Sequence, residues 1–424
     1  MSNQLGSLKM GQKFKITPAG EIPVEWEVKT LEEVCDILDT QRVPLNNEER
    51  SGIKGNIPYY GANGIVDYIN KYIFDEDLIL IAEDGGYFDE YLTRPIAYPI
   101  KGKAWVNNHA HVLRVKQGED FSWVYYNLVH KNILPYINGG TRAKLNQADL
   151  RIIPIPCPVV SEQKKVGQVL SSVDESLSSI SLEIKKTKEL RKGLMRQLLT
   201  RGIGHEKFKK TEIGQIPESW SLVTFGDAFS FLRNGSNSRD ELTDAGDVGY
   251  VHYGDLHTKW QTKLDCSEVA LPKIEARLIA GLPFLENGDL IMADASEDYA
   301  GVGVSVEIEN VEKQKIVAGL HTMLLRDKTK IFVNGFRGYI QYVPAVHNSF
   351  VKIATGGSVY GISKSNVQTI KIPCPPHKEQ EQIKGILAAL DLKLKNQKIH
   401  LEKISGLKMS LMSVLLTGKV RVLK

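Results

Sequence analysis

The 424-residue chain has no apolar stretch close to the ~20 residues that a membrane-spanning helix needs. Its first residues also lack the apolar core of a secretory signal peptide, so we expect a cytoplasmic protein. Four cysteines, Cys35, Cys157, Cys266 and Cys374, are scattered without a CxxC pair. Neither a disulfide framework nor a zinc ribbon is therefore indicated.

Catalytic signatures are scarce. The sequence contains no GxxxxGK[ST] phosphate-binding loop, no NPPY or DPPY segment, and no Gly-rich loop of the methyl-donor type opening a helix. His109 and His111 form an HxH pair, but only His109 has an equivalent later in the chain, His321. A packed or hydrogen-bonded histidine is the favoured interpretation over a zinc ligand. We predict a chain without catalytic residues, metal or cofactor.

Basic charge is concentrated in two places although the net charge is only +4. Residues 185–210 contain ten Lys or Arg and two Glu, and residues 392–424 contain eight Lys or Arg and one Glu. The remainder of the chain is therefore acidic, with a net charge of −11. Part of this pattern complements helix dipoles, and it also suits an acidic partner such as a nucleic-acid backbone.

Residues 161–200 have the pattern of one long helix with a narrow apolar seam. Apolar residues recur at alternating intervals of four and three, interrupted only at Thr187 and Arg191. A repeat of 3.5 residues suits packing against a single partner helix. A helix of this length would span roughly 60 Å. The predicted seam is Val166, Leu170, Val173, Leu177, Ile180, Ile184, Leu194 and Leu198.

The partner helix is in the same chain. Adding 217 to each seam position gives a second seam, interrupted at Gln397 and Lys408. The "IPCP" segment before the first helix also recurs before the second, and "LMRQLLT" recurs as "LMSVLLT". Two copies in one register favour paired helices over two separate core helices. The second seam is Ile383, Leu387, Leu390, Leu394, Leu401, Ile404, Leu411 and Leu415.

The repeat extends to the segments before the helices. "KFKITPAGEIPVEW" at residues 13–26 returns as "KFKKTEIGQIPESW" at residues 207–220. Short β-rich apolar stretches also correspond, including Leu78–Ala82 with Leu290–Ala293, whereas the segments between them differ. This predicts one architecture with two different sets of loops. The expected domains are residues 1–160, 161–204, 205–376 and 377–424.

The predicted fold class is α+β. Two mixed α/β globular units, related by a pseudo-two-fold internal repeat, are joined by two long helices. Because the first helix leads into the second unit and the second helix leaves it, a two-fold relation makes the helices pair as an antiparallel coiled coil. We interpret this coiled coil as a spacer.

Four polar segments are candidates for DNA contact, because Arg, Asn and hydroxyl side chains read base edges and bind phosphates, and paired glycines permit close approach. Two are the Tyr-rich turn at Pro58–Gly64 and the loop at Arg233–Arg239. The other two are the repeat-equivalent segments Gly139–Asn146 and Gly356–Ser365. Ordinary polar turns and β-bulges remain alternatives for each. The residues singled out are Tyr60, Asn63, Thr141, Arg142, Lys144, Arg233, Asn234, Ser236, Asn237, Arg239, Ser358, Tyr360, Ser363 and Lys364.

These features resemble the specificity subunits of type I restriction-modification enzymes over essentially the whole chain. The resemblance is carried by the repeated "GG[ST]…IPCP…EQ" pattern before each long helix, the "LLT" helix ends and "KFKxTxxGxIPxxW". "YYGANGIVDY" and "NNHAHVLRV" resemble segments of one type of target recognition domain in that family. On this resemblance Asn107, Asn108 and His109 join the DNA-binding candidates.

The resemblance implies two target recognition domains, each reading one half of an asymmetric bipartite site in double-stranded DNA. It also implies assembly with two N6-adenine methyltransferase (modification) subunits, and with restriction subunits in the full complex. A specificity subunit supplies no catalytic residue.

Other interpretations remain open. The chain could be the specificity subunit of a fused-type system, or an anti-restriction or half-specificity relative. It could instead be a coiled-coil scaffold that binds proteins without reading DNA, or, least in keeping with its motifs, a self-sufficient methyltransferase.

Overall fold

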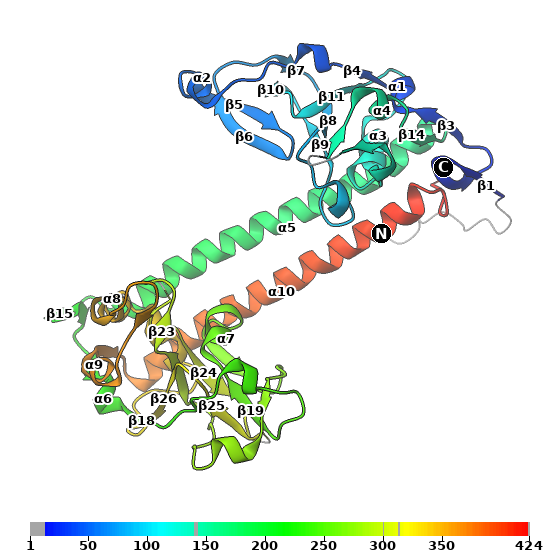
Figure 1. Cartoon of the computed structure of the whole chain (residues 1–424). Coiled ribbons are helices and arrows are strands. Elements are labelled where there is room, and N and C mark those ends of the chain that lie inside the picture. The colour runs from blue at the N-terminus through cyan, green and yellow to red at the C-terminus, as the bar shows by residue number, and fades with distance from the viewer. Residues whose placement is uncertain (1–12, 140–142, 300, 313, 423–424) are drawn as a thin grey trace. The chain divides into compact units, whose positions relative to one another are not determined.

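The computed structural model describes residues 13–139, 143–299, 301–312 and 314–422. The chain divides into two compact units (Figure 1). Unit 1 comprises the chain up to Leu182 together with the segment from Lys398 onward, and unit 2 comprises Glu183–Gln397. Each unit therefore contains a globular part and a portion of both long helices.

The two long helices are α5, Val160–Arg201, and α10, His377–Leu415. Within unit 1, Asp174 of α5 forms an ion pair with Lys408 of α10, with Oδ1 and Nζ 2.6 Å apart. Within unit 2, Arg191 of α5 forms an ion pair with Asp391 of α10. Since the partner number falls as the α5 number rises, the helices are antiparallel, which confirms the predicted pairing.

These ion pairs explain the charged interruptions of the two seams. Arg191 and Lys408 are repeat equivalents, and so are their partners Asp391 and Asp174. In unit 2, the Tyr339 hydroxyl also donates a hydrogen bond of 3.0 Å to Asp391. A charged residue in an apolar seam forms its ion pair in one register only, so these pairs specify the alignment of the helices.

Every position of the predicted seams is buried or half-buried. Apolar helix residues outside the seams, such as Leu182, Leu190 and Leu392, are more than half exposed. The seam also continues into the globular parts. Val166 and Leu170 of α5 join the core of unit 1, and Ile383 and Leu387 of α10 join the core of unit 2.

The globular part of unit 1 contains two four-stranded sheets, with orders β6-β5-β10-β7 and β4-β11-β8-β9. Helix α3, Phe121–Val129, packs against β9. The first sheet consists of β5 (Lys54–Gly61), β6 (Gly64–Ile69), β7 (Phe74–Asp75) and β10 (Lys103–Val106). The second consists of β4 (Cys35–Ile37), β8 (Leu78–Ala82), β9 (Ala97–Ile100) and β11 (Ala110–Val115).

The central strand β8 explains an uninterrupted apolar run in the sequence. All five of its residues are buried, because both of its faces are covered. Leu78 and Leu80 belong to a small core with residues of β7, β9, β10 and β11. Ile79 and Ile81 belong to the larger core that includes α3, α5 and α10. A strand buried on both faces is continuously apolar, so the usual alternation disappears.

The globular part of unit 2 has a five-stranded sheet of order β18-β26-β22-β24-β20, a three-stranded sheet of order β21-β19-β25, and the pair β23-β27. The central strand β22 has the same two-sided burial as β8: Leu290 and Met292 face one core, and Ile291 and Ala293 face another. The strands are β18 (Phe229–Leu232), β19 (Val248–Val251), β20 (Lys263–Asp265), β21 (Lys273–Ile274), β22 (Leu290–Ala293), β23 (Ala295–Ser296), β24 (Ser305–Glu309), β25 (Ile316–Ala318), β26 (Thr322–Asp327) and β27 (Tyr360–Gly361).

A 3-10 helix, η6 (Arg337–Tyr342), leads into α8, Pro344–Ile353. Pro344 fixes a helical backbone angle at the start of α8. The remaining short helices that matter below are η1 (Asp39–Gln41), α4 (Gln147–Arg151), α7 (Tyr253–Thr258) and α9 (Lys364–Thr369).

The globular part of each unit ends in a strand that leads into a long helix. These strands are β14 (Pro154–Cys157) and β28 (Lys371–Cys374). Within the described part of the chain, β14 pairs only with β3 (Glu27–Thr30), and β28 pairs only with β17 (Ser221–Thr224). Proline has no N–H to donate, so it fits strands with one paired edge. The equivalent residues Gln163 and Gln380 are buried in the first turns of α5 and α10, where their amides bind the preceding Pro158 and Pro375 carbonyls.

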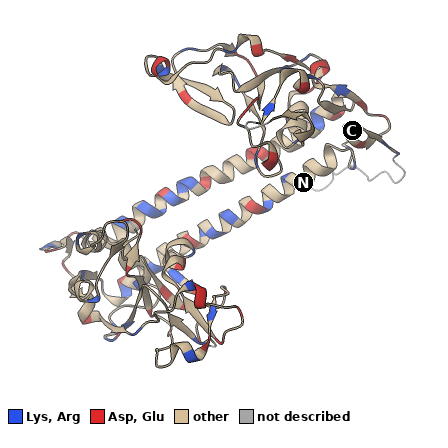
Figure 2. Cartoon of the chain, in the orientation of Figure 1, with Lys and Arg blue, Asp and Glu red and all other residues tan. Residues whose placement is uncertain are grey.

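Small hairpins open each half of the chain. They are formed by β1 (Phe14–Thr17) with β2 (Gly20–Pro23) and by β15 (Phe208–Thr211) with β16 (Gly214–Pro217). Lys and Arg residues recur along both long helices (Figure 2). Among the described residues, no helix combines the length and apolar character that a membrane span requires.

Candidate nucleic-acid interface

Predicted DNA-contact segments of unit 1 meet at the loop that follows β8. The Asn63 side-chain amide, in the turn between β5 and β6, donates to the Gly85 carbonyl at 2.9 Å. His109, between β10 and β11, places Nδ1 2.9 Å from Asp84 Oδ1. Lys144, in β13 (Lys144–Leu145), forms a β-bridge with Asp84. Four loops are thereby brought to one place.

We call this group the first reading edge, and define it as Asn63, Asp84, Asn108, His109 and Lys144. Asn63, Asn108 and Lys144 are exposed, and His109 is half-buried. Since Asp84 occupies Nδ1 of His109, the other ring nitrogen is the one left for a ligand.

Two other predicted residues of unit 1 make contacts within the chain. Asn107 is buried, and its side-chain oxygen accepts the His109 backbone N–H at 2.8 Å, which shapes the loop. The Tyr60 ring stacks on Tyr98 with centroids 5.9 Å apart and packs against the smaller core. Thr141 and Arg142 lie outside the described residues.

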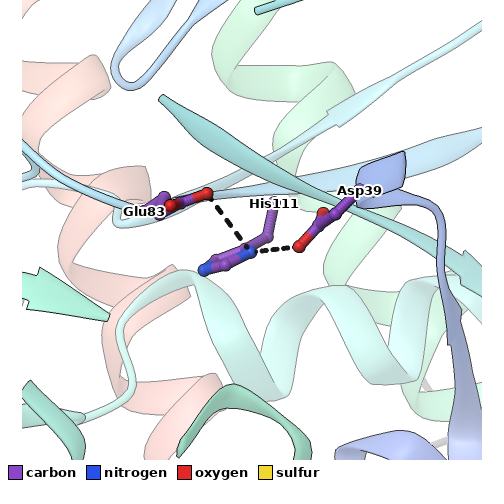
Figure 3. Close-up of side chains that lie close together, drawn as sticks. All are labelled: Asp39, Glu83 and His111. Atoms are coloured by element: carbon purple, nitrogen blue, oxygen red, sulfur yellow. Dashed lines mark hydrogen bonds and ion pairs between the residues drawn. The ribbon is translucent and has the colours of Figure 1, made fainter. Parts of the chain in front are cut away.

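A buried polar network joins Asp39 and His111, close to Glu83 (Figure 3). His111 Nδ1 is 2.6 Å from Asp39 Oδ2, and Nε2 is 2.8 Å from the Leu145 carbonyl oxygen. Burial raises the pKa of Asp39, but the hydrogen bond and charge of His111, with further help from Arg42, outweigh it and leave that pKa below its usual value. The network joins η1, β11 and the segment before α4.

Glu83 extends this network to the first reading edge. Its carboxylate meets Arg42 Nη1 at 2.6 Å and Lys144 Nζ at 2.9 Å. Burial raises the pKa of Glu83, and the hydrogen bonds from Lys144 and Arg42 more than reverse this, so the net pKa is lowered. Glu83, which directly follows β8, thus holds the first reading edge in place through its ion pairs with Arg42 and Lys144.

Asp39, Glu83 and His111 offer ligand atoms within 4.8 Å of one another, a spacing that a metal ion could bridge. Their chemistry favours the polar network instead. Arg42 and Lys144 already neutralise the carboxylates, and both imidazole nitrogens of His111 face oxygen atoms at hydrogen-bond distance. Two cations this close would oppose the binding of a third.

Unit 2 assembles an equivalent edge after β22. His321, the repeat equivalent of His109, places Nδ1 3.2 Å from Asp294 Oδ1. Burial raises the pKa of Asp294, and the His321 charge offsets part of that rise. The Asp294 carbonyl accepts the Ile362 N–H at 2.9 Å, which brings the segment after β27 to this place.

The loop after β18 joins the same edge. The Asn234 amide donates to the Gly319 carbonyl at 3.2 Å, and Lys364 Nζ lies 3.4 Å from the Leu232 carbonyl oxygen. Arg233 and Lys364 are exposed, whereas Asn234 is half-buried. The Tyr360 ring lies against Tyr299, with centroids 3.9 Å apart. We define the second reading edge as Arg233, Asn234, Asp294, His321, Tyr360, Ser363 and Lys364.

The other residues of unit 2 that were predicted to contact DNA lie at the second reading edge or close to it in the sequence. Asn237 binds Glu241 within its own loop, and Arg239 binds Asp255 of α7 at 3.2 Å. Ser236 is exposed nearby. Ser363 is the N-cap of α9, where its hydroxyl accepts the Asn366 N–H.

Ser358 lies in an exposed turn. There Gly356 has a φ of +138°, and a Cβ atom on it would lie 1.9 Å from the Val359 carbonyl oxygen. Glycine is therefore required by the turn itself, so this glycine does not by itself indicate a ligand.

Sequence reasoning missed the carboxylates that orient the two histidines. Asp84 and Asp294 each follow a fully buried apolar strand, and each meets a histidine from the loop before a neighbouring strand. Tyr253 of α7 was also missed, and its ring packs edge-on against His321, with centroids 5.3 Å apart. The recurrence of His109 as His321 was the available signal, but it identified neither partner.

Comparison with known proteins agrees with this architecture. The family model for the type I restriction modification DNA specificity domain matches residues 23–190 and 217–403. A putative type I restriction enzyme specificity subunit of Haemophilus influenzae is 29% identical, over 86% of each chain. The putative MjaX specificity subunit of Methanocaldococcus jannaschii is 26% identical, over 97% of each chain.

Solved structures show the same fold at low sequence identity. The crystal structure of the type I restriction-modification S subunit from M. genitalium aligns with a TM-score of 0.57 at 14% identity, covering 92% of this chain and 96% of that one. A structure from work on the assembly and conformational transition of the type I system aligns with a TM-score of 0.54 at 16% identity, covering 94% and 99%.

The two matched regions and the α+β fold define a DNA target-recognition protein built from a duplicated unit. The chain belongs to the type I restriction-modification specificity subunit family. It is accordingly a non-catalytic subunit that specifies the DNA target.

Proposed function

We propose that each unit reads one half of an asymmetric, bipartite site in double-stranded DNA through its reading edge. The observation that carries this proposal is the equivalent histidine–aspartate pair in both units, His109 with Asp84 and His321 with Asp294. The pair has the same place in each unit, after the buried central strand, while the exposed residues around it differ. A shared platform with different surrounding residues suits two different half-site sequences.

The side chains at the edges have the appropriate chemistry. Asn and Arg can form paired hydrogen bonds with purine edges, and Lys binds phosphate or guanine. Asn63, Asn108 and Lys144 supply these groups in unit 1, and Arg233 and Lys364 in unit 2. Because Glu83 already pairs with Lys144, the first edge has little excess positive charge. We expect weak DNA binding by the isolated chain.

We further propose that the paired helices set the gap between the half-sites and carry the docking surfaces of two N6-adenine methyltransferase subunits. Restriction subunits would join in the full complex. The symmetric ion pairs of α5 and α10, which fix one register, support a defined spacer length. The proposed target recognition domains are residues 1–160 and 205–376, and the proposed helical spacers are residues 161–204 and 377–424.

The test is co-expression with a methyltransferase partner, followed by mapping of methylated adenines across a genome. The wild-type chain should produce one bipartite motif. The substitutions Asn63→Ala and His109→Ala should relax the bases of one half-site, and Arg233→Ala and Lys364→Ala those of the other. Each lost base contact should reduce discrimination by about 1–3 kcal/mol.

Two control substitutions, Lys101→Ala and Lys273→Ala, remove exposed charges of the globular parts outside both edges and should leave the motif unchanged. The proposal fails if edge variants with normal folding and assembly methylate the wild-type motif with unchanged discrimination. A protein scaffold that does not read DNA would give that result. Duplex affinity that falls steeply with salt would separately show phosphate contact.

A further inference from the structure

Unit 2 contains a pocket of about 520 Å³ between α5 and the globular part, apart from the second reading edge. Trp260 and Tyr342 provide aromatic walls, and Leu256 and Val302 provide aliphatic ones. Pockets of 300–1,000 Å³ with apolar and aromatic linings are typical of small-molecule sites. The volume and lining therefore suit a compact ligand with a planar ring.

The rim of this pocket is basic. Lys192 and Arg196 lie one turn apart on α5, and His257 and His347 lie on α7 and α8. None of the described lining residues is Asp or Glu. Across the described chain, no carboxylate forms an ion pair with Lys192 or Arg196, and both are exposed. Two unpaired cations above an apolar floor favour a ligand with an anionic group.

The wall formed by Tyr342 is fixed before any ligand arrives. The Tyr342 hydroxyl donates to the Gln261 carbonyl at 3.2 Å, and the amide of the adjacent Gln341 donates to the same oxygen at 3.1 Å. The Gln341 side-chain oxygen accepts the Ser305 N–H at 3.1 Å. A preformed wall lowers the entropy cost of binding a rigid ring.

The basic residues of the rim are not repeated in the other half of the chain. The equivalents of Lys192 and Arg196 in α10 are Met409 and Ser413, which carry no charge. A partner that bound both halves alike would need the same groups in both. The charge difference therefore favours a separate ligand, bound once per chain, over a second copy of a symmetric protein contact.

We propose that this pocket binds a nucleotide, with the base against Trp260 and Tyr342 and the phosphate on Lys192 and Arg196. A planar heteroaromatic ring and an attached phosphate match the two halves of the lining. Helix α7 connects this site to the second reading edge, because it carries His257 in the pocket and Tyr253 against His321. Nucleotide binding would therefore be linked to recognition of the second half-site.

The experiment is calorimetric titration of the purified full chain with AMP, adenosine and inorganic phosphate. AMP should bind at one site per chain, and adenosine and phosphate should each bind about tenfold more weakly or worse. The double variant Lys192→Glu/Arg196→Glu should weaken AMP binding by at least about tenfold. Trp260→Phe, which keeps an aromatic ring, should weaken it less than Trp260→Ala.

The matched control is Lys186→Glu, which reverses an exposed charge of α5 outside the pocket and should leave AMP binding unchanged. Unfolding curves that match wild type would show that the variants are folded. Equal AMP binding by the double variant and wild type would overturn the proposal, as would no AMP binding at millimolar concentration. Protection of Trp260 by a methyltransferase subunit, with no effect of AMP, would assign the pocket to a protein contact instead.

Discussion

The spacer proposal makes a quantitative prediction for a paired deletion of one heptad. The deletion removes residues 177–183 from α5 and residues 399–405 from α10, two segments that lie opposite each other in the helix pair. Both seams keep their alternation of four and three residues across the joins. The ion pairs Asp174–Lys408 and Arg191–Asp391 lie outside the deleted segments and stay in register.

The size of the effect follows from helix geometry. Seven residues at 1.5 Å each shorten the spacer by about 10.5 Å, which equals about three base pairs at 3.4 Å. Three base pairs also carry about 100° of DNA twist, so methylation should become less efficient. The unread gap should shorten by two to four base pairs, while both half-site sequences persist.

Folding should survive the paired deletion. It removes Leu177, Ile180, Leu401 and Ile404, all half-buried, and with them about 3–6 kcal/mol of apolar burial. The fourteen deleted residues no longer have to be ordered, which offsets much of this loss. Deleting the heptad from α5 alone is the control. It shifts one helix against the other by about 10.5 Å and should abolish the paired structure.

The assay is the methylated-adenine map described above, compared between wild type and the paired deletion. An unchanged gap in a folded, active deletion variant would refute the spacer. So would new bases within either half-site, because the reading edges are untouched by the deletion.

Three further predictions concern stability and reactivity. Arg191→Ala should lower the free energy of unfolding of unit 2 by about 1–3 kcal/mol in urea. The loss should be smaller than for a fully buried ion pair, because the side chains of Arg191 and Asp391 are 12% and 28% exposed. The double variant Arg191→Ala/Asp391→Ala should recover part of this loss, and losses that simply add would contradict an interaction between the two residues. The lowered pKa of Asp39 means that its ionised form adds stability above its unfolded pKa near 4, and that this contribution disappears as pH falls through the lower folded value. The stability gap between wild type and Asp39→Asn should therefore narrow below about pH 4, and a gap independent of pH would contradict the network. Burial raises the pKa of the Cys35 and Cys157 thiols to about 12, so alkylation at pH 8 should require unfolding, and rapid labelling of the native chain would show that these thiols are accessible.

Much of the architecture was predictable because it depends on local periodicity. The seams of α5 and α10 are regular over many turns, and their recurrence at a fixed offset identified the partner helix. Strands β8 and β22 were predictable for a similar reason: strands buried on both faces are continuously apolar. Chain connectivity then required the helices to be antiparallel.

The candidate interface was only partly predictable. Asn63 and His109 lie in different loops and Lys144 lies in strand β13, and their meeting at residues 84 and 85 depends on strand order. Nothing in the local sequence distinguishes Asp84 from other loop carboxylates. Tyr60 and Asn107 are predicted contacts whose packing and loop-shaping interactions within the chain were not visible in the sequence.

The amino-acid sequence by itself determined the duplicated plan, the paired helices and the scarcity of catalytic groups. Such features arise from side chains close together in the chain or repeated at a constant interval. Only the tertiary structure decided which loops converge, which carboxylates orient His109 and His321, and how Lys192 comes to border a pocket with Trp260. These outcomes depend on long-range packing, in which a contact is set by the whole arrangement of strands and helices.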